Sequence, residues 1–244
     1  MKIKYAALIS IVLLFTTCKK DHMLDCFKSA GKIVTDSRTS SPFVNIDLNN
    51  NVDLVINPNS AFYIKVTAGE NIIDGIITEI DGGTLYIRNE NRCNWMRSFK
   101  NTYTVEVGMD KPVNITYYGS GDINCKDTIR SDEFTFDCKN GSGSINFLFN
   151  CEATHLNNHT GRSDIHAKGF SRVSYIYLND VGTLDAEEFE TNNSYITNTS
   201  TGDIKVKVKE DLGVIIKYVG NIFYTGNPHT ISQNITGSGK LIAF

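Results

Sequence analysis

Hydrophobic and polar residues alternate in a repeating unit of 18–22 residues throughout the second half of the chain. In each unit a small residue is followed by a polar residue and then by Ile or Leu, and two positions later stands another apolar or small residue. Alternation with a period of two is typical of a β-strand with one buried face. The seven occurrences of this corner motif are Gly121-Asp-Ile123, Gly143-Ser-Ile145, Ser163-Asp-Ile165, Gly182-Thr-Leu184, Gly202-Asp-Ile204, Gly220-Asn-Ile222 and Gly239-Lys-Leu241.

Equivalent corners at this spacing predict coils that stack on one another, each adding strands to a parallel sheet. The alternative is an antiparallel sandwich with regular turns, for which a spacing of about ten residues would be expected. Because the units resemble one another at 18–22 residues, we predict an all-β, parallel β-helix-like solenoid of six to seven turns. We expect the corner glycines to supply a positive φ angle that other residues adopt with difficulty.

The first half of the chain lacks this repeat, so we expect one domain with non-repeat strands over 41–110 and repeated coils over 111–244. Phe43–Leu48 and Val52–Ile56 alternate on either side of three asparagines and are expected to pair with each other. Glu70–Ile77 has apolar residues at i, i+1, i+4 and i+5, which predicts one short helix. Further strands are expected over Phe62–Thr67, Thr84–Arg88 and Thr102–Val107.

The N-terminus combines a basic start with a short apolar run. Met1–Lys4 carries two lysines, and Tyr5–Phe15 is apolar over 11 residues. A bilayer requires about 20 apolar residues, so this segment is typical of a signal peptide rather than a membrane span. Thr16-Thr17-Cys18 resembles a bacterial lipobox, although Phe15 replaces the favoured Leu. We therefore predict cleavage after residues 1–17 and lipidation of Cys18, with an ordinary secretory leader as the alternative.

Composition and charge limit what the rest of the chain can be. Residues 18–40 are polar and are expected to form a tether between the anchor and the single domain over 41–244. Hydrophobic residues make up 41% and charged residues 21%, which is typical of a folded protein. The formal net charge of −3 argues against a protein that coats nucleic acid. The expected partner of the anchor is therefore a membrane.

Five cysteines remain after Cys18, and none of them forms a Cys-x-x-Cys pair. A tetrahedral zinc site consequently has no support, and we expect no metal and no cofactor. Cys125, Cys138 and Cys151 fall on the inward faces of predicted strands, where a thiol behaves as a small hydrophobic group and reacts slowly.

Several polar clusters are candidates for ligand or catalytic sites. Asp122, Asp164 and Asp203 recur on alternate coils, about 9–10 Å apart, which is too far for one calcium ion, so we expect them to cap turns. His155 and His159 would lie about 13 Å apart along a strand and could not chelate together. The acidic run over Asp185–Glu190 is expected to be a solvated face.

Aromatic residues offer a second kind of candidate surface. They could bind sugar rings or could equally fill and flank the core: Tyr175, Tyr177, Tyr195, Tyr218, Tyr224 and Trp95. Asp127-Thr128-Ile129 resembles the O-glycosylation signal of exported proteins from Bacteroidota-type bacteria, which makes Thr128 a candidate for modification.

Three stretches of the sequence resemble a known family. They are FVNIDL from Phe43, IKVTAGENIIDGIITEIDGGTLYI from Ile64 and VNITYYGSGDI from Val113. They are similar to the putative auto-transporter adhesin, head GIN domain family, and the resemblance covers about Ser41 to Phe244. It implies a single-stranded right-handed β-helix-like fold in a lipoprotein of the bacterial cell envelope.

The resemblance also suggests a disulfide and a function. Asp25–Lys28 and Cys93–Arg97 look like a feature of one subgroup of the family, and they could pair Cys26 with Cys93. Together with the leader, the resemblance predicts a lipid-anchored envelope protein, in the outer membrane, that presents an adhesive surface to glycans or surface proteins without catalysis. The alternatives are a carbohydrate-binding or carbohydrate-cleaving β-helix, which grouped carboxylates would favour, and a purely structural envelope component.

Overall fold

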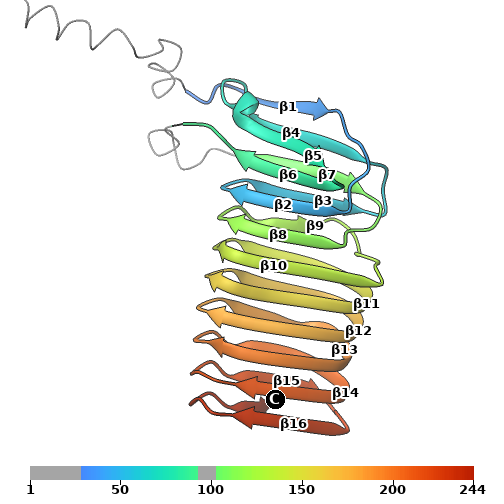
Figure 1. Ribbon diagram of the computed structural model, residues 1–244, viewed down its shortest axis with the longest axis vertical. Coiled ribbons are helices and arrows are strands. Elements are labelled where there is room, and N and C mark those ends of the chain that lie inside the picture. Colours follow the sequence, from blue (N-terminus) through green and yellow to red (C-terminus); the bar gives the residue numbers. More distant parts are fainter. Residues whose placement is uncertain (1–28, 93–102) are drawn as a thin grey trace, which may run out of the picture.

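The computed structural model describes residues 29–92 and 103–244, which form a β-solenoid of about six turns (Figure 1). All the described strands belong to one hydrogen-bonded sheet, and no described segment is an α-helix. The strands are β1 (Ile33–Arg38), β2 (Asn45–Asn50), β3 (Asp53–Pro58), β4 (Tyr63–Gly69), β5 (Ile76–Asp81), β6 (Thr84–Asn89), β7 (Thr104–Met109), β8 (Asn114–Gly119), β9 (Ile123–Cys125), β10 (Glu133–Gly141), β11 (Ser144–Gly161), β12 (Asp164–Asp180), β13 (Thr183–Ser200), β14 (Ile204–Ile216), β15 (Ile222–Gly226), β16 (Thr230–Ile235) and β17 (Leu241–Ala243). The all-β solenoid predicted from the alternation is confirmed.

One column of Ile and Leu runs through the consecutive coils, as the corner motif predicted. The parallel register places the apolar residue of each motif directly beside that of the next coil. The column consists of Ile123, Ile145, Ile165, Leu184, Ile204, Ile222 and Leu241, of which all but the half-buried Leu241 are buried. Burial of each such side chain contributes about 1.5–3 kcal/mol, so this column is a main source of the stability of the stack.

A cluster of phenylalanines fills the middle of the solenoid. Neighbouring rings of the cluster have centroids 5.2–5.4 Å apart and are tilted or edge-on to one another. Its members are Phe134, Phe136, Phe147, Phe149 and Phe189, all of them buried. Tilted and edge-on pairs at this distance are favourable for aromatic rings, and they bind β10, β11 and β13 to one another across the interior.

The corner glycines are required by the close approach of the neighbouring coil, not by the backbone angle that we expected. A Cβ atom on Gly202 would lie 1.8 Å from the carbonyl oxygen of Gly182, and one on Gly143 would lie 2.1 Å from that of Gly121. Neither Gly202 nor Gly143 is among the glycines with positive φ. The expectation of a left-handed corner was wrong at Gly143 and Gly202, where glycine is needed because the stacked coil leaves no room for a Cβ atom.

The first half of the chain joins the same solenoid, in an order that differs from the order of the sequence. β2 pairs in parallel with β6 on one side and β8 on the other, and β3 pairs likewise with β7 and β9. The coil of β2 and β3 therefore lies between coils made from later residues (Figure 1). The expected pairing of β2 with β3 is wrong, because they are successive sides of one coil that turns at Asn50, where φ is 66°.

The segment Glu70–Ile77, expected to be a short helix, contains only the 3₁₀ turn η3 (Ile73–Gly75). No side chain caps its N-terminus, and β5 begins at Ile76 and pairs antiparallel with β6. Ile72, Ile73 and Ile76 are buried, so the apolar spacing did identify the inward residues. The β-branched side chains of this segment favour extended backbone, which explains why the chain enters a strand after a single turn.

Antiparallel strands close the end of the solenoid that lies opposite the repeats (Figure 1). β1 pairs antiparallel with β4, and β4 pairs antiparallel with β7. β1 lies within residues 18–40, so the segment from Ile33 onward belongs to the folded body and not to a tether. Alternation could not reveal this strand, because none of its residues is buried. Its Arg38 side chain instead donates hydrogen bonds to the carbonyl oxygens of Ile73 and Ile76 and to the Thr78 hydroxyl.

Candidate functional site

Several residues singled out in the sequence lie outside the described residues. They are Cys18, Cys26, Cys93 and Trp95. Lipidation of Cys18 and a bond between Cys26 and Cys93 therefore stay predictions. In the described ranges, no helix is both long enough and apolar enough to cross a membrane.

The three cysteines of the repeat are unpaired. Cys138 and Cys151 are buried, and Cys125 is half-buried against the core. Burial raises the pKa of all three thiols, that of Cys125 to about 12. A thiol with such a pKa stays protonated at neutral pH, so these side chains pack as small hydrophobic groups and are poor nucleophiles.

The aspartates of the corner motif connect neighbouring coils. Each accepts a hydrogen bond from the next coil: Asp122 Oδ1 from the Ser144 N–H (2.9 Å), Asp164 Oδ1 from the Thr183 hydroxyl (2.6 Å) and Asp203 Oδ1 from the Asn221 N–H (2.8 Å). These hydrogen bonds tie the corners of neighbouring coils together. Among the residues that the structure describes, no group of three His, Cys, Asp or Glu side chains is placed to hold a metal ion.

The acidic run is neutralised by lysines on the neighbouring coils. Glu188 pairs with Lys168 at 2.8 Å, and Glu190 pairs with both Lys207 and Lys209. The hydrogen bond from Lys209, with a smaller effect from Lys207, lowers the pKa of the Glu190 carboxyl. A catalytic acid of a glycosidase needs a raised pKa, so the shift at Glu190 is opposite to what carbohydrate cleavage requires.

The two histidines each pair with a carboxylate on β10. His155 Nε2 lies 3.0 Å from Glu133 Oε1, and His159 Nε2 lies 3.0 Å from Asp137 Oδ1. The His155 ring also packs against the ring of Tyr175, with centroids 4.8 Å apart and 13° between the planes. The histidines thus belong to the outer face that carries the tyrosines.

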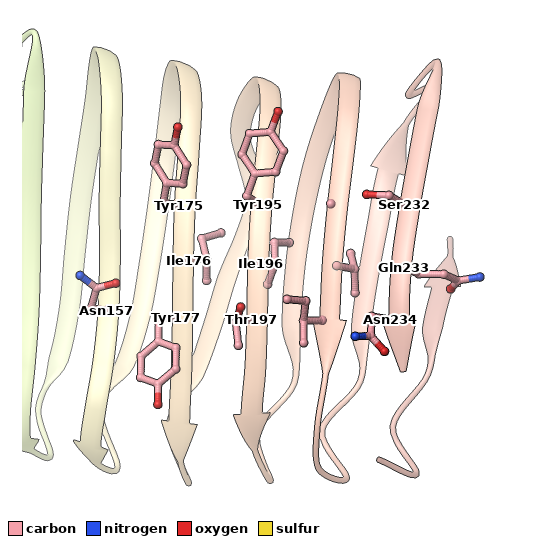
Figure 2. Close-up of a pocket in the computed structure, with 13 residues that line it drawn as sticks. Asn157, Tyr175, Ile176, Tyr177, Tyr195, Ile196, Thr197, Ser232, Gln233 and Asn234 are labelled. Carbon is pink, nitrogen blue, oxygen red and sulfur yellow. The ribbon is translucent and has the colours of Figure 1, made fainter. Parts of the chain in front are cut away.

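Two tyrosines form an exposed aromatic surface on neighbouring coils. Tyr175 of β12 and Tyr195 of β13 are register partners, with 41% and 44% of their surface exposed. Their ring centroids lie 5.6 Å apart, with 23° between the planes, which is an offset arrangement and not a face-to-face sandwich. Figure 2 shows the faces of both rings turned toward the viewer. These faces are available for a planar or apolar group from outside the protein.

The aromatic surface borders a groove of about 520 Å³, here called the Gly213 groove. Gly213 follows Tyr195 in register, and Ser232 of β16 follows Gly213. A Cβ atom on Gly213 would lie 2.8 Å from Tyr195 Cδ1, so the tyrosine ring leans over the position where a side chain is missing. The groove is lined by Asn157, Tyr175, Ile176, Tyr177, Tyr195, Ile196, Thr197, Gly213, Val214, Ile215, Ser232, Gln233 and Asn234 (Figure 2).

The sequence revealed this groove only in part. Tyr175, Tyr177 and Tyr195 were singled out and are brought together, whereas Tyr218 and Tyr224 do not line the groove. Gly213 was missed as its central feature. A glycine inside a strand can mark a place where a ligand or another chain approaches closely, and this was the signal available.

Thr128 lies in the segment between β9 and β10 and is half-buried. Its backbone N–H bonds to the Asp127 carboxylate at 2.6 Å, and its carbonyl oxygen accepts a hydrogen bond from Asn59 Nδ2 at 2.8 Å. The hydroxyl makes no hydrogen bond to any described residue. Glycosylation of Thr128 stays a prediction.

Comparison with solved structures finds the same fold in several bacterial proteins. A putative adhesin from Bacteroides fragilis aligns with a TM-score of 0.81 at 19% identity, over 87% of this chain and 97% of that chain. A putative adhesin from Parabacteroides distasonis aligns with a TM-score of 0.66 at 16% identity, over 88% and 98%. A putative lipid binding protein from the same organism aligns with a TM-score of 0.56 at 20% identity, over 88% and 97%.

The sequence itself carries the family assignment. No curated protein sequence matches the chain. A family model described as "putative auto-transporter adhesin, head GIN domain" matches residues 42–228, which include most of the solenoid. The resemblance seen in the sequence is thereby confirmed, and the chain belongs to the putative auto-transporter adhesin, head GIN domain family.

Proposed function

We propose that the chain is a lipid-anchored protein of the bacterial outer membrane whose solenoid presents an adhesive surface and performs no catalysis. The observation that carries this proposal is the combination of the adhesin family match with an elongated solenoid that exposes an aromatic groove. A rod of stacked coils offers a long side surface to partners, and contiguous apolar surface on such a face marks interaction sites.

Anchoring is supported by the N-terminal residues. The basic start, the apolar run over Tyr5–Phe15 and the lipobox-like Thr16-Thr17-Cys18 are together typical of a lipoprotein leader. Each methylene of an acyl chain contributes about 0.8 kcal/mol of membrane binding, so several chains on Cys18 would hold the protein stably.

The absence of catalysis is supported by the ion pairs of the acidic run over Asp185–Glu190. Glu187, Glu188 and Glu190 each form an ion pair with a lysine. The pKa of the Glu190 carboxyl is lowered, which favours its ionised form over the protonated form that a catalytic acid needs. The buried thiols of the repeat are likewise unsuited to nucleophilic attack.

Adhesion can be measured directly with beads that carry the full chain with Cys18→Ser. The beads are applied under flow to surfaces coated with mucin, extracellular-matrix proteins or a glycan array. Retention on at least one surface, above that of beads coated with albumin, is the expected result. Retention no greater than that of albumin on every surface would overturn the proposed adhesive function.

A further inference from the structure

We infer that the Gly213 groove binds a neutral sugar ring of a glycan, with the ring resting on the exposed faces of Tyr175 and Tyr195. This inference rests on the proposed adhesive function, because it names the ligand class through which the surface would adhere. It assigns the ligand to one outer face, formed by β12, β13, β14 and β16 (Figure 2).

The charge of the groove selects a neutral ligand. None of its thirteen lining residues carries an acidic or basic side chain. Other parts of the outer surface are lined by ion pairs, such as Lys168 with Glu188 and Arg172 with Glu152. A phosphate, a sialic acid or an acidic peptide would find no counter-ion in the groove and would lose hydration without compensation.

The aromatic surface selects a flat, partly apolar ring. Tyr175 and Tyr195 expose 41% and 44% of their surface although both lie within the stacked coils. A pyranose has one face of C–H groups that can lie on an aromatic face, with hydroxyl groups around its edge. Because Gly213 has no side chain, the Tyr195 ring can lean over this position, where a Cβ atom would lie 2.8 Å from Tyr195 Cδ1.

The polar rim suits the hydroxyl groups of such a ring. Thr197, Ser232 and Asn234 line the groove, and their side chains make no hydrogen bond to any described residue. Their hydroxyl and amide groups can both donate and accept hydrogen bonds, as sugar hydroxyls do. Recognition pockets of 300–1,000 Å³ typically combine apolar walls with a few such polar groups, and the groove of about 520 Å³ lies in that range.

An acyl chain fits the groove less well than a sugar ring. The aliphatic side chains beneath the aromatic surface, Ile176, Ile196 and Val214, are only 2–3% exposed. Among the aliphatic lining residues, only Ile215, at 36%, is substantially exposed. A lipid tail needs continuous aliphatic surface, which this groove lacks, whereas a sugar ring needs aromatic faces and uncharged hydrogen-bonding groups.

The inference is tested with the full chain carrying Cys18→Ser, on an array of neutral oligosaccharides. The array displays glucose, galactose, mannose, fucose and N-acetylhexosamines, and the glycan bound best is then titrated by calorimetry. Tyr195→Ala removes one aromatic face and is expected to weaken binding about tenfold. Gly213→Phe places a side chain against the Tyr195 ring, must displace that ring, and is expected to weaken binding at least as much.

The matched control is Tyr86→Ala. Tyr86 is 36% exposed on β6, near the opposite end of the solenoid, so the same truncation there is expected to leave affinity unchanged (Figure 1). Circular dichroism and thermal unfolding establish that each variant is folded. If Gly213→Phe is unfolded, Tyr195→Ala alone decides the outcome.

Three results would overturn the inference. They are no binding of any neutral glycan at millimolar concentration, equal affinity of Tyr195→Ala and the parent chain, and binding only to phosphatidylcholine and phosphatidylglycerol vesicles. Beads that are retained on a protein-coated surface while every neutral glycan fails would contradict the sugar site and leave the adhesive function standing. Beads that are retained nowhere would contradict the adhesive function itself.

Discussion

Ile145 and Ile204 show how much a single residue of the buried column matters. Both side chains are fully buried between the equivalent residues of two neighbouring coils. Truncation of either to Ala removes buried methyl groups and leaves a cavity, so the free energy of unfolding should fall by about 2–5 kcal/mol. Urea denaturation followed by circular dichroism measures the change. Val181→Ala, at a site 40% exposed, serves as the control and should change stability by much less.

The thiols of the repeat predict a labelling pattern. Cys125, Cys138 and Cys151 should react slowly in the native protein, because burial raises the pKa of each and limits access. If Cys26 and Cys93 are bonded, denaturation without reductant should release three reactive thiols in the mature chain. Five labelled thiols, or a mapped bond that includes any cysteine of the repeat, would contradict this assignment.

Cys125 also predicts how stability depends on pH. The unfolded thiol ionises near its ordinary pKa of 9.0, whereas the folded thiol has a pKa of about 12. Between these values the unfolded state binds fewer protons than the folded state, so stability falls as the pH rises above about 9. Unfolding free energies at pH 8 and pH 10 should therefore differ more in the parent chain than in Cys125→Ala. Equal differences would show that this thiol ionises normally in the folded protein.

At the scale of the elements, Arg38 is the only half-buried residue of β1, and its side chain joins β1 to the η3 turn and β5. The Arg38 guanidinium donates hydrogen bonds to carbonyl oxygens of the η3 turn and β5 and to Thr78, while the other residues of β1 are exposed. Arg38→Ala should therefore release β1 from β4 with little effect on the repeated coils. Hydrogen exchange should show faster exchange at β1 and unchanged exchange at β12. Asp36→Ala removes only the exposed ion pair with Arg38 and should leave both rates unchanged.

The sequence predicted those elements whose side chains alternate between core and solvent. The Ile/Leu column was assigned correctly at every coil because its period of two is repeated seven times. β1 was missed because none of its side chains is buried, so backbone pairing and side-chain hydrogen bonds of Thr35 and Arg38 define it. Only part of the aromatic surface could be predicted: the tyrosines were identified from the sequence as candidates. The groove beside these tyrosines could not be predicted, because it depends on the register that pairs Gly213 with Tyr195, and this register is known only from the fold.

At the scale of the whole molecule, the proposed lipid anchor at Cys18 determines whether the protein is bound to membranes. Cys18 follows an apolar run and two threonines, as in lipoprotein leaders. Cys18→Ser should move the protein from the membrane fraction to the soluble fraction, because the acyl chains that would hold it are lost. Fractionation with a carbonate wash measures the shift, and Cys125→Ser, within the repeat, is the control that should stay with membranes. A Cys18→Ser protein that still sediments with washed membranes would contradict the lipoprotein assignment.

The position of the β2–β3 coil has a consequence for biosynthesis. This coil leaves the ribosome before β6 and β7 and before β8 and β9, yet it pairs with strands from both groups. One of its edges therefore stays unpaired until β6 and β7 have been made, and the other until β9 ends at Cys125, more than sixty residues after Pro58. Unpaired strand edges are prone to pair with other chains, and non-local pairing slows folding. Until its partners are made, this coil consequently exposes strand edges to mispairing, whereas each coil after β9 can pair with a preceding coil that is already complete.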